Sequence, residues 1–210
     1  MRREPREIGV RGAAALIGVQ AAGMAIIGIA IWQASGRPVA AIVSLDAWQL
    51  VLGLGLAALL VTTAAGFQAL APDLSHRLLV EQARAYPFLQ EPLGWKAIAW
   101  FSLCAGIGEE IAFRAGAQTW LVDRLGTVPG IMAATAAFAA IHLSKPPIML
   151  IQFVIGLLIA VPFAWSGSLL AAIVGHTLYD IWALANLQKH VARHRIESAT
   201  KLSDREAELP

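Results

Sequence analysis

The sequence predicts an all-α protein, a polytopic membrane helical bundle with about six transmembrane helices. Three observations support this prediction. Hydrophobic residues make up 58% of the 210 residues and the mean hydropathy is +0.64, which is more apolar than a soluble domain. Charged residues make up only 14% and gather at the chain ends and in a few connections. The apolar runs between them approach or reach the roughly 20 residues that a helix needs to cross a hydrocarbon core.

Six apolar runs follow one another along the chain. The first is too long for the apolar part of a secretory signal, so we expect a first spanning helix there. The fourth is short and rich in alanine, and small residues allow membrane helices to approach closely. Tryptophans stand at several run ends, as is typical of the membrane interface. We expect transmembrane helices at residues 12–32, 48–70, 95–120, 129–142, 148–165 and 169–187.

The distribution of basic residues predicts the orientation in the membrane. Six spans put both termini on one side, together with Arg77, Arg84 and Lys145, whereas Arg37 and Arg124 lie opposite. Because basic loops stay in the cytoplasm, we expect both termini to be cytoplasmic. The protein would be a multi-pass integral protein of a bacterial or archaeal cytoplasmic membrane. The net charge of +2 argues against a nucleic-acid partner.

The runs divide the chain into three parts. Residues 1–94 hold two N-terminal transmembrane helices and a cytoplasmic connecting segment, residues 95–187 a four-helix core, and residues 188–210 a polar cytoplasmic tail. In the connecting segment, residues 74–85 have helical periodicity, which fits a helix on the membrane surface or an ordinary solvated loop helix. We expect the tail to be disordered from about Ser198.

Three charged residues interrupt the third apolar run. Glu109, Glu110 and Arg114 fall within six residues, and each charge at the centre of a bilayer costs roughly 2.5–3.5 kcal/mol. The fold must shelter them, and intramembrane ionisable residues indicate a functional site. Glu110 precedes Arg114 by four residues, which favours an ion pair on one helix face. Glu109 points about 100° away, so it remains free to act as a general base.

Further polar residues lie in the fourth and sixth runs. His142 follows Phe138 by four residues, so the phenyl ring can wall the same pocket, and His176 precedes Asp180 by four. Asp180 is therefore expected to orient the His176 imidazole. At 1.5 Å per residue, Glu109, His142 and His176 lie roughly 16, 20 and 12 Å from the outer boundary. These three side chains can meet in one layer of the bundle.

The three polar motifs together resemble the signature of the CAAX protease and bacteriocin-processing family (CPBP, Abi). This family of intramembrane proteases includes the type II CAAX prenyl endopeptidases. The motifs are E-E-x-x-x-R at 109–114, F-x-x-x-H at 138–142 and H-x-x-x-D at 176–180. The resemblance covers residues 95–187 and implies a four-helix catalytic core that hydrolyses a peptide bond in or next to the membrane.

The resemblance also implies roles for the site residues. Glu109, helped by His142, activates a water molecule, and His176 with Asp180 stabilises the oxyanion. Many family members carry asparagine where this chain has Asp180, and a carboxylate cannot donate a hydrogen bond unless it is protonated. We therefore favour His176, as imidazolium, as the oxyanion partner.

The resemblance implies that Glu110 and Arg114 hold the site together. It also favours metal-free hydrolysis, so no cofactor is expected. Zinc is the alternative, because Glu109, His142 and His176 would form a set of two histidines and one carboxylate with a position left for water.

The expected function is an intramembrane endopeptidase whose substrate is a membrane protein or a lipid-anchored peptide, with the lipid bilayer as its surroundings. Two other functions remain open from the sequence. One is a non-catalytic immunity or scaffold protein of the same fold. The other is a small transporter or proton channel that uses the buried carboxylate as a relay.

Overall fold

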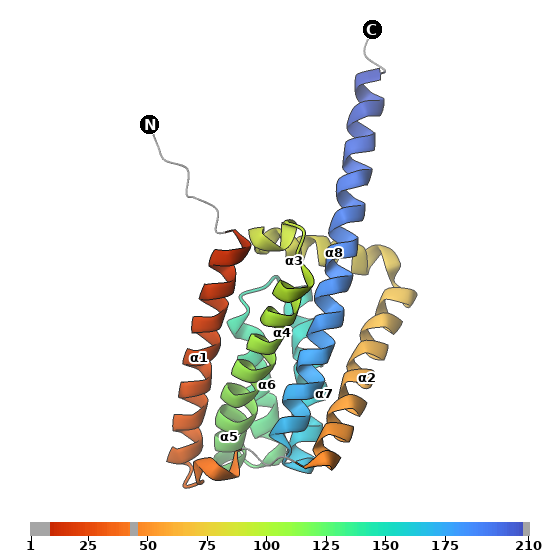
Figure 1. Ribbon diagram of the computed structural model, residues 1–210. Helices are drawn as coiled ribbons and strands as arrows, with labels where there is room; N and C mark the ends of the chain where they lie inside the picture. Colours follow the sequence, from red (N-terminus) through yellow and green to blue (C-terminus); the bar gives the residue numbers. More distant parts are fainter. Residues whose placement is uncertain (1–8, 43–45, 208–210) are drawn as a thin grey trace.

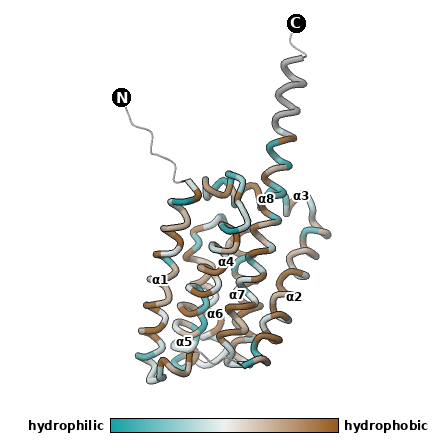
Figure 2. Tube along the Cα trace, in the orientation of Figure 1, coloured by the Kyte–Doolittle hydropathy of each residue, from teal (hydrophilic) through white to brown (hydrophobic). Residues whose placement is uncertain are grey.

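The protein is an all-α bundle in the computed structural model, which describes residues 9–42 and 46–207. Within these residues, four helices are long and apolar enough to cross a membrane: α1 (Val10–Ala34), α2 (Ala47–Leu70), α7 (Pro146–Ser166) and residues 169–196 of α8 (Leu169–Ala207). Hydrophobic residues run along these helices in Figure 2. The chain is therefore a multi-pass integral membrane protein.

The third and fourth predicted spans take a different form. Residues 95–125 are helical throughout, but the segment is divided into α4 (Trp95–Glu110), the π-helix η3 (Ile111–Gln118) and α5 (Thr119–Leu125). After Gly126, α6 (Thr127–Ile141) is an apolar helix of 15 residues. Neither α4 nor α6 alone has the length of the four long helices, so only four of the six expected spans qualify by length and composition.

The helices stand side by side, with α1 at one side of the view in Figure 1 and α2 at the other. The short helix α3 (Pro72–Ala85) lies across one end of the bundle. The start of α1 and the end of α8 lie at this same end (Figure 1). This placement agrees with an even number of crossings between the two.

Glycine follows or separates helices where the backbone needs a positive φ. Gly36 follows α1 with φ 76°, Gly126 separates α5 from α6 with φ 87°, and Gly167 separates α7 from α8 with φ 65°. Glycine adopts these angles without the steric cost that a Cβ brings. At the start of α2, the Asp46 side chain caps the helix by accepting from the Trp48 N–H at 3.1 Å.

Small residues allow α1 to approach the polar third run closely. A Cβ on Gly28 would lie 2.3 Å from the carbonyl oxygen of Ile111, and a Cβ on Gly108 would lie 2.9 Å from that of Ala21. A Cβ on Gly116 would meet the Cα of Gly28 at 2.9 Å. Such glycine contacts bring two helix backbones together. They fix α1 against the segment that carries Glu109, Glu110 and Arg114.

The helix expected at residues 74–85 is present as α3 and packs on α8. Ala83 of α3 and Leu89 form a buried apolar cluster with Leu187 and Val191 of α8. The rest of its surface is largely polar, with Asp73, Arg77 and Arg84 exposed. An amphipathic helix that lies against a bundle end in this way buries one face and presents the other to its surroundings.

The expectation of a disordered tail from about Ser198 is wrong. Helix α8 continues to Ala207, beyond the bundle in Figure 1. The physical reason is composition: residues 188–207 are rich in alanine, lysine, arginine and glutamate and contain neither glycine nor proline. These residues are favourable or neutral in a helix, so α8 has no stop signal before its end.

Candidate active site

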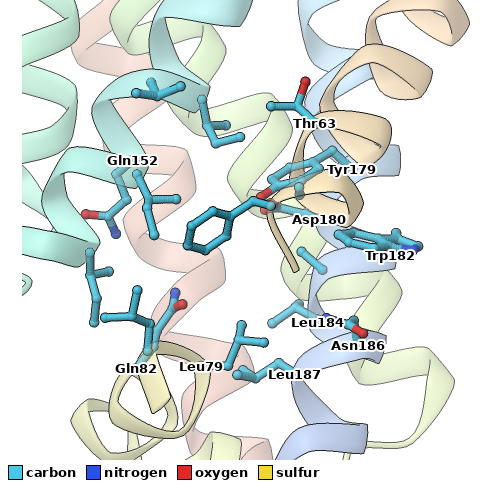
Figure 3. A pocket seen from close by; sticks show the side chains of 18 of the residues that line it. Thr63, Leu79, Gln82, Gln152, Tyr179, Asp180, Trp182, Leu184, Asn186 and Leu187 are labelled. Atoms are coloured by element: carbon cyan, nitrogen blue, oxygen red, sulfur yellow. The ribbon is translucent and has the colours of Figure 1, made fainter. Parts of the chain in front are cut away.

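A cavity of about 500 Å³ opens between α2, α3, α7 and α8. Figure 3 shows its walls, with Gln152 of α7 on one side of the view and Asp180 and Trp182 of α8 on the other. Among its lining residues are Glu109, Phe138, His142, His176 and Asp180. The structure thus brings the expected catalytic residues of three separate segments to one cavity, as the depth estimate allowed.

Glu109 and His142 face each other in this cavity. The Oε2 atom of Glu109 lies 4.0 Å from Nε2 of His142, and their side chains are 16% and 23% exposed. The other ring nitrogen, Nδ1, lies 2.8 Å from the Phe138 carbonyl oxygen. A carbonyl oxygen only accepts, so Nδ1 carries the proton of this hydrogen bond. In the neutral ring, Nε2 then presents a lone pair toward Glu109.

Glu110, at the end of α4, contacts His176 of α8. Its Oε2 accepts from Nε of Arg114 at 3.0 Å, and its Oε1 lies 2.7 Å from Nδ1 of His176. The side chains of Glu110 and Arg114 are fully buried, and that of His176 is 6% exposed. The predicted pair of Glu110 and Arg114 is present. Because the Glu110 carboxylate accepts from two partners, it fixes the position of the His176 ring as well.

Asp180 lies at the opposite edge of the same imidazole. Its Oδ2 is 3.6 Å from Nε2 of His176, which is longer than a hydrogen bond. The close partner of His176 is therefore Glu110, and Asp180 contributes a nearby carboxylate at the cavity side. The spacing of four residues predicts that Asp180 lies close to His176. It does not predict that Nδ1 of His176 points toward Glu110 at the end of α4.

Phe138 packs among the polar side chains. Its ring centroid is 4.9 Å from that of His142, 6.4 Å from that of His176 and 5.3 Å from that of Phe113, all in edge-to-face arrangements. The Arg114 guanidinium carbon lies 5.2 Å from the same centroid, within cation–π range. Phe138 thus fills the space between the two histidines, in agreement with the predicted apolar wall.

Two further residues support the site without having been expected. The Tyr86 hydroxyl donates to the carbonyl oxygen of His142 at 3.4 Å, and the Gln118 amide donates to the carbonyl oxygen of Ala160 on α7 at 2.9 Å. Burial, with a smaller contribution from the charge of Glu109, raises the pKa of Tyr86, so its hydroxyl remains a donor. Gln118 follows Arg114 by four residues, so the two polar side chains share one helix face. This spacing is a sequence signal from which Gln118 could have been identified as a buried polar residue near the site.

An ion pair joins the connection after α6 to α3. Lys145, in the connection that follows His142, forms an ion pair with Glu81 of α3. This ion pair lowers the pKa of Glu81, so the carboxylate stays charged at neutral pH. The next residue after His142, Leu143, has φ 48°, a conformation that costs energy for a residue with a Cβ.

The zinc alternative does not fit this arrangement. Among residues 9–42 and 46–207, no group of three histidine, cysteine, aspartate or glutamate side chains is placed to hold a metal ion. We therefore derive no step that passes through a metal ion.

Residues 91–182 match the family model of the Type II CAAX prenyl endopeptidase Rce1-like family. Residues 91–182 are an Rce1-like domain. This finding confirms the resemblance drawn from the motifs, since all three lie within the matched segment. No curated protein and no solved structure matches the chain. The Rce1-like domain contains every expected site residue, whereas α2 and α3, which also line the cavity, precede it.

Proposed function

We propose that this protein is an intramembrane endopeptidase that uses a water molecule activated by Glu109. The Rce1-like domain supports peptidase activity. The observation that carries the mechanism is the pairing of Glu109 with His142 across 4.0 Å at the cavity wall. A carboxylate and an imidazole lone pair that face each other are a suitable pair of proton acceptors for one water.

The separation of these two groups suits a bridging water. A separation of 4.0 Å is too long for a direct hydrogen bond, and a polar pair at such a distance is commonly bridged by water. A water about 2.8 Å from each atom fits this gap. Glu109 would take a proton from this water as the oxygen attacks the scissile carbonyl carbon, and the proton would then pass to the leaving amine.

His176 is proposed as the partner of the developing oxyanion. Its Nδ1–H donates to the buried carboxylate of Glu110, and as imidazolium it would direct a second N–H from Nε2 toward the cavity. Donors already aimed at the place where charge develops are an effective way to stabilise a transition state. Asp180, 3.6 Å from Nε2, would favour the imidazolium before substrate enters.

Glu110 and Arg114 are proposed as positioning residues. Both are fully buried and form a 3.0 Å hydrogen bond, so neither is available to substrate. Their function would be to hold His176 at a fixed angle with respect to Glu109. A displacement of about 1 Å at such a site can lower the rate by about 100-fold.

The proposed substrate is a membrane protein or a lipid-anchored peptide. The cavity walls that surround the polar groups are mostly apolar, with contributions from Phe67, Ile151, Trp182 and Leu184. An extended peptide with apolar side chains or an attached lipid would bury apolar surface there. The peptide bond to be hydrolysed would then lie next to the polar side chains of Glu109, His142 and His176.

We also propose that all six apolar segments cross the membrane. In this arrangement α4, η3 and α5 form one continuous crossing and the short α6 forms another. Six crossings put both termini on the same side, and the basic residues on that side favour the cytoplasm. Residues 1–94 then supply two N-terminal crossings and a connecting segment, residues 95–187 the catalytic core and residues 188–210 the tail. The common end of α1 and α8 supports this topology.

The test compares cells that carry the wild-type protein with cells that carry Glu109→Gln. Proteomics of peptide termini should reveal at least one membrane-associated precursor that accumulates uncleaved in the variant. Glu91→Gln, the same change at an exposed position outside the cavity, should process the precursor normally. If the two variants give the same peptide termini, Glu109 has no role in proteolysis.

A further inference from the structure

The active-site cavity contains two side-chain amides that the proposed chemistry does not use. Gln82 of α3 and Gln152 of α7 line it, and both lie on the same side of the view in Figure 3. The Gln82 side chain has no hydrogen-bond partner within residues 9–42 and 46–207. In this same part of the chain, Oε1 of Gln152 is buried and has no partner either. Both amides therefore keep hydrogen-bonding groups that a ligand can use.

Other amides on α2 and α8 serve to join parts of the protein. Nδ2 of Asn186 on α8 donates to Oε1 of Gln68 on α2 at 3.1 Å. The amide of Gln188 on α8 bonds through both of its polar atoms to the backbone of the segment between α3 and α4, at 2.8 and 3.0 Å. Gln82 differs from these three residues, because it lines the cavity and joins nothing.

Gln152 lies close to the proposed catalytic histidine. Its Nε2 donates to Oγ of Ser144 at 3.3 Å. The Ser144 hydroxyl in turn donates to the carbonyl oxygen of His142 at 3.3 Å. Two hydrogen bonds thus link Gln152 of α7 to His142, and Oε1 of Gln152 is the polar atom that this chain of bonds leaves unused.

Gln82 lies next to the same connection from the side of α3. The residue before it, Glu81, forms an ion pair with Lys145, which follows His142 by three residues. The connection after His142 is therefore held by α3 through this ion pair and by α7 through Gln152. Both amides lie beside the segment that carries the proposed catalytic imidazole.

The main chain of a peptide is the ligand that matches these amides. Peptide N–H and C=O groups that leave water need hydrogen-bond partners, and their burial is costly without them. A carboxamide has an acceptor oxygen and two donor hydrogens, and it carries no charge that must be desolvated. The surrounding walls are mostly apolar, so the side chains of a bound peptide can contact residues such as Ile151 and Leu184.

We propose that the side-chain amides of Gln82 and Gln152 bind the main chain of an extended substrate peptide next to the bond to be cleaved. Gln152 would accept a substrate N–H at Oε1, and Gln82 would pair with a main-chain group from the α3 side. The substrate class is then an extended apolar segment that is recognised through its backbone. The position of the cleaved bond rests on the proposed function, whereas binding of the peptide does not require cleavage.

The test measures peptide binding to the purified full-length Glu109→Gln protein in a neutral detergent, so that the peptide stays intact. The probe is a tritiated hexapeptide of alternating leucine and alanine, with an acetylated N-terminus and an amidated C-terminus. Its analogue has ester oxygens in place of the two central main-chain N–H groups. We expect the analogue to bind at least about 5-fold more weakly, as the net contribution of one hydrogen bond predicts.

Gln82→Met and Gln152→Met are each added to the Glu109→Gln protein. Methionine keeps the length of the side chain and removes the amide, so both variants should bind the peptide more weakly and discriminate less against the ester. Gln90→Met is the matched control, because Gln90 is exposed and lies outside the cavity lining, and it should leave both affinities unchanged. An unchanged Tm verifies the fold, and Gln82→Met removes no hydrogen bond within the described residues.

The outcomes separate this inference from the proposed function. Equal affinities for the peptide and the ester, no saturable binding of either, or equal affinities in all three methionine variants would overturn it. Discrimination that is lost in Gln82→Met and Gln152→Met would support it even if the wild-type protein cleaves no precursor. Cleavage by the wild type together with equal binding of peptide and ester would remove this inference and leave the proposed protease intact.

Discussion

Nδ1 of His176 lies 2.7 Å from Oε1 of Glu110, so a carboxylate at the end of α4 holds an imidazole of α8. The two residues are 66 positions apart in the chain. The other oxygen of Glu110 accepts from Arg114. The two adjacent glutamates therefore have different surroundings: Glu110 is fully buried between Arg114 and His176, and Glu109 borders the cavity.

Glu110→Gln should destabilise the protein. Its amide retains one acceptor oxygen for two donors and leaves the buried Arg114 without a counter-charge. The loss of one partner from a buried ion pair typically costs about 3–5 kcal/mol. Thermal unfolding in detergent should therefore show a clearly lower Tm for Glu110→Gln and little change for Glu109→Gln. Equal Tm values for the two variants would show that the buried pair does not stabilise the fold.

Gly28→Leu should disrupt the site from a helix that lies outside the Rce1-like domain. A Cβ at residue 28 would lie 2.3 Å from the Ile111 carbonyl oxygen, so α1 and η3 must separate. We expect a lower Tm and loss of cleavage. Gly23→Leu is the matched control, because a Cβ there meets nothing within 4 Å. A Gly28→Leu protein with the Tm and activity of Gly23→Leu would contradict the observed packing of α1.

Arg37 and Asp123 should make stability dependent on acid and salt. Two hydrogen bonds, of 2.5 and 3.0 Å, join their side chains, which are 34% and 37% exposed. The hydrogen bonds to Arg37 lower the pKa of Asp123. A lowered native pKa means that this stabilisation is present above the unfolded pKa of about 3.9 and is lost as pH falls through the native value.

The expected size of this effect is small, because exposed ion pairs contribute about 0–1 kcal/mol. Asp123→Asn should lower the Tm slightly at pH 7, and the difference from the wild type should shrink below pH 4 or in 1 M salt. A difference that stays constant across pH and salt would mean that charge is not responsible.

Chelators should leave proteolysis unchanged. Within the described residues, no group of three suitable side chains is placed around a metal position. We expect purified active protein to retain its rate after treatment with 1,10-phenanthroline, and elemental analysis to find less than one zinc per chain. Inactivation that is reversed by added zinc would show that the site rearranges around a metal ion.

The positions of most helices could be predicted from the sequence, because glycine marks several of the connections between them. Gly36, Gly126 and Gly167 stand where the backbone takes a positive φ. The apolar runs became helical close to where they were expected, except that the third run is divided into three segments and α8 continues past residue 187 to Ala207. The pairing of Glu110 with Arg114 was also predictable, since four residues separate them on one helix.

Other features depend on contacts between distant segments. The bond from His176 to Glu110 depends on how α8 packs on α4, and the i,i+4 spacing pointed instead to Asp180. The π-helix η3 has no simple pattern in its residues, although such segments often occur at functional sites. The prediction of disorder after Ser198 was based on the polarity of the tail and neglected the helix propensity of its residues, which form the end of α8.

The most direct test of the proposed mechanism is the cleavage rate of purified Glu109→Gln on the precursor found by terminal proteomics. We predict a fall of at least about 100-fold, since general base catalysis contributes about 10²–10⁴, while Tm and elution remain as in the wild type. A Glu109→Gln protein that is folded and cleaves at the wild-type rate would contradict the proposal that Glu109 activates the water.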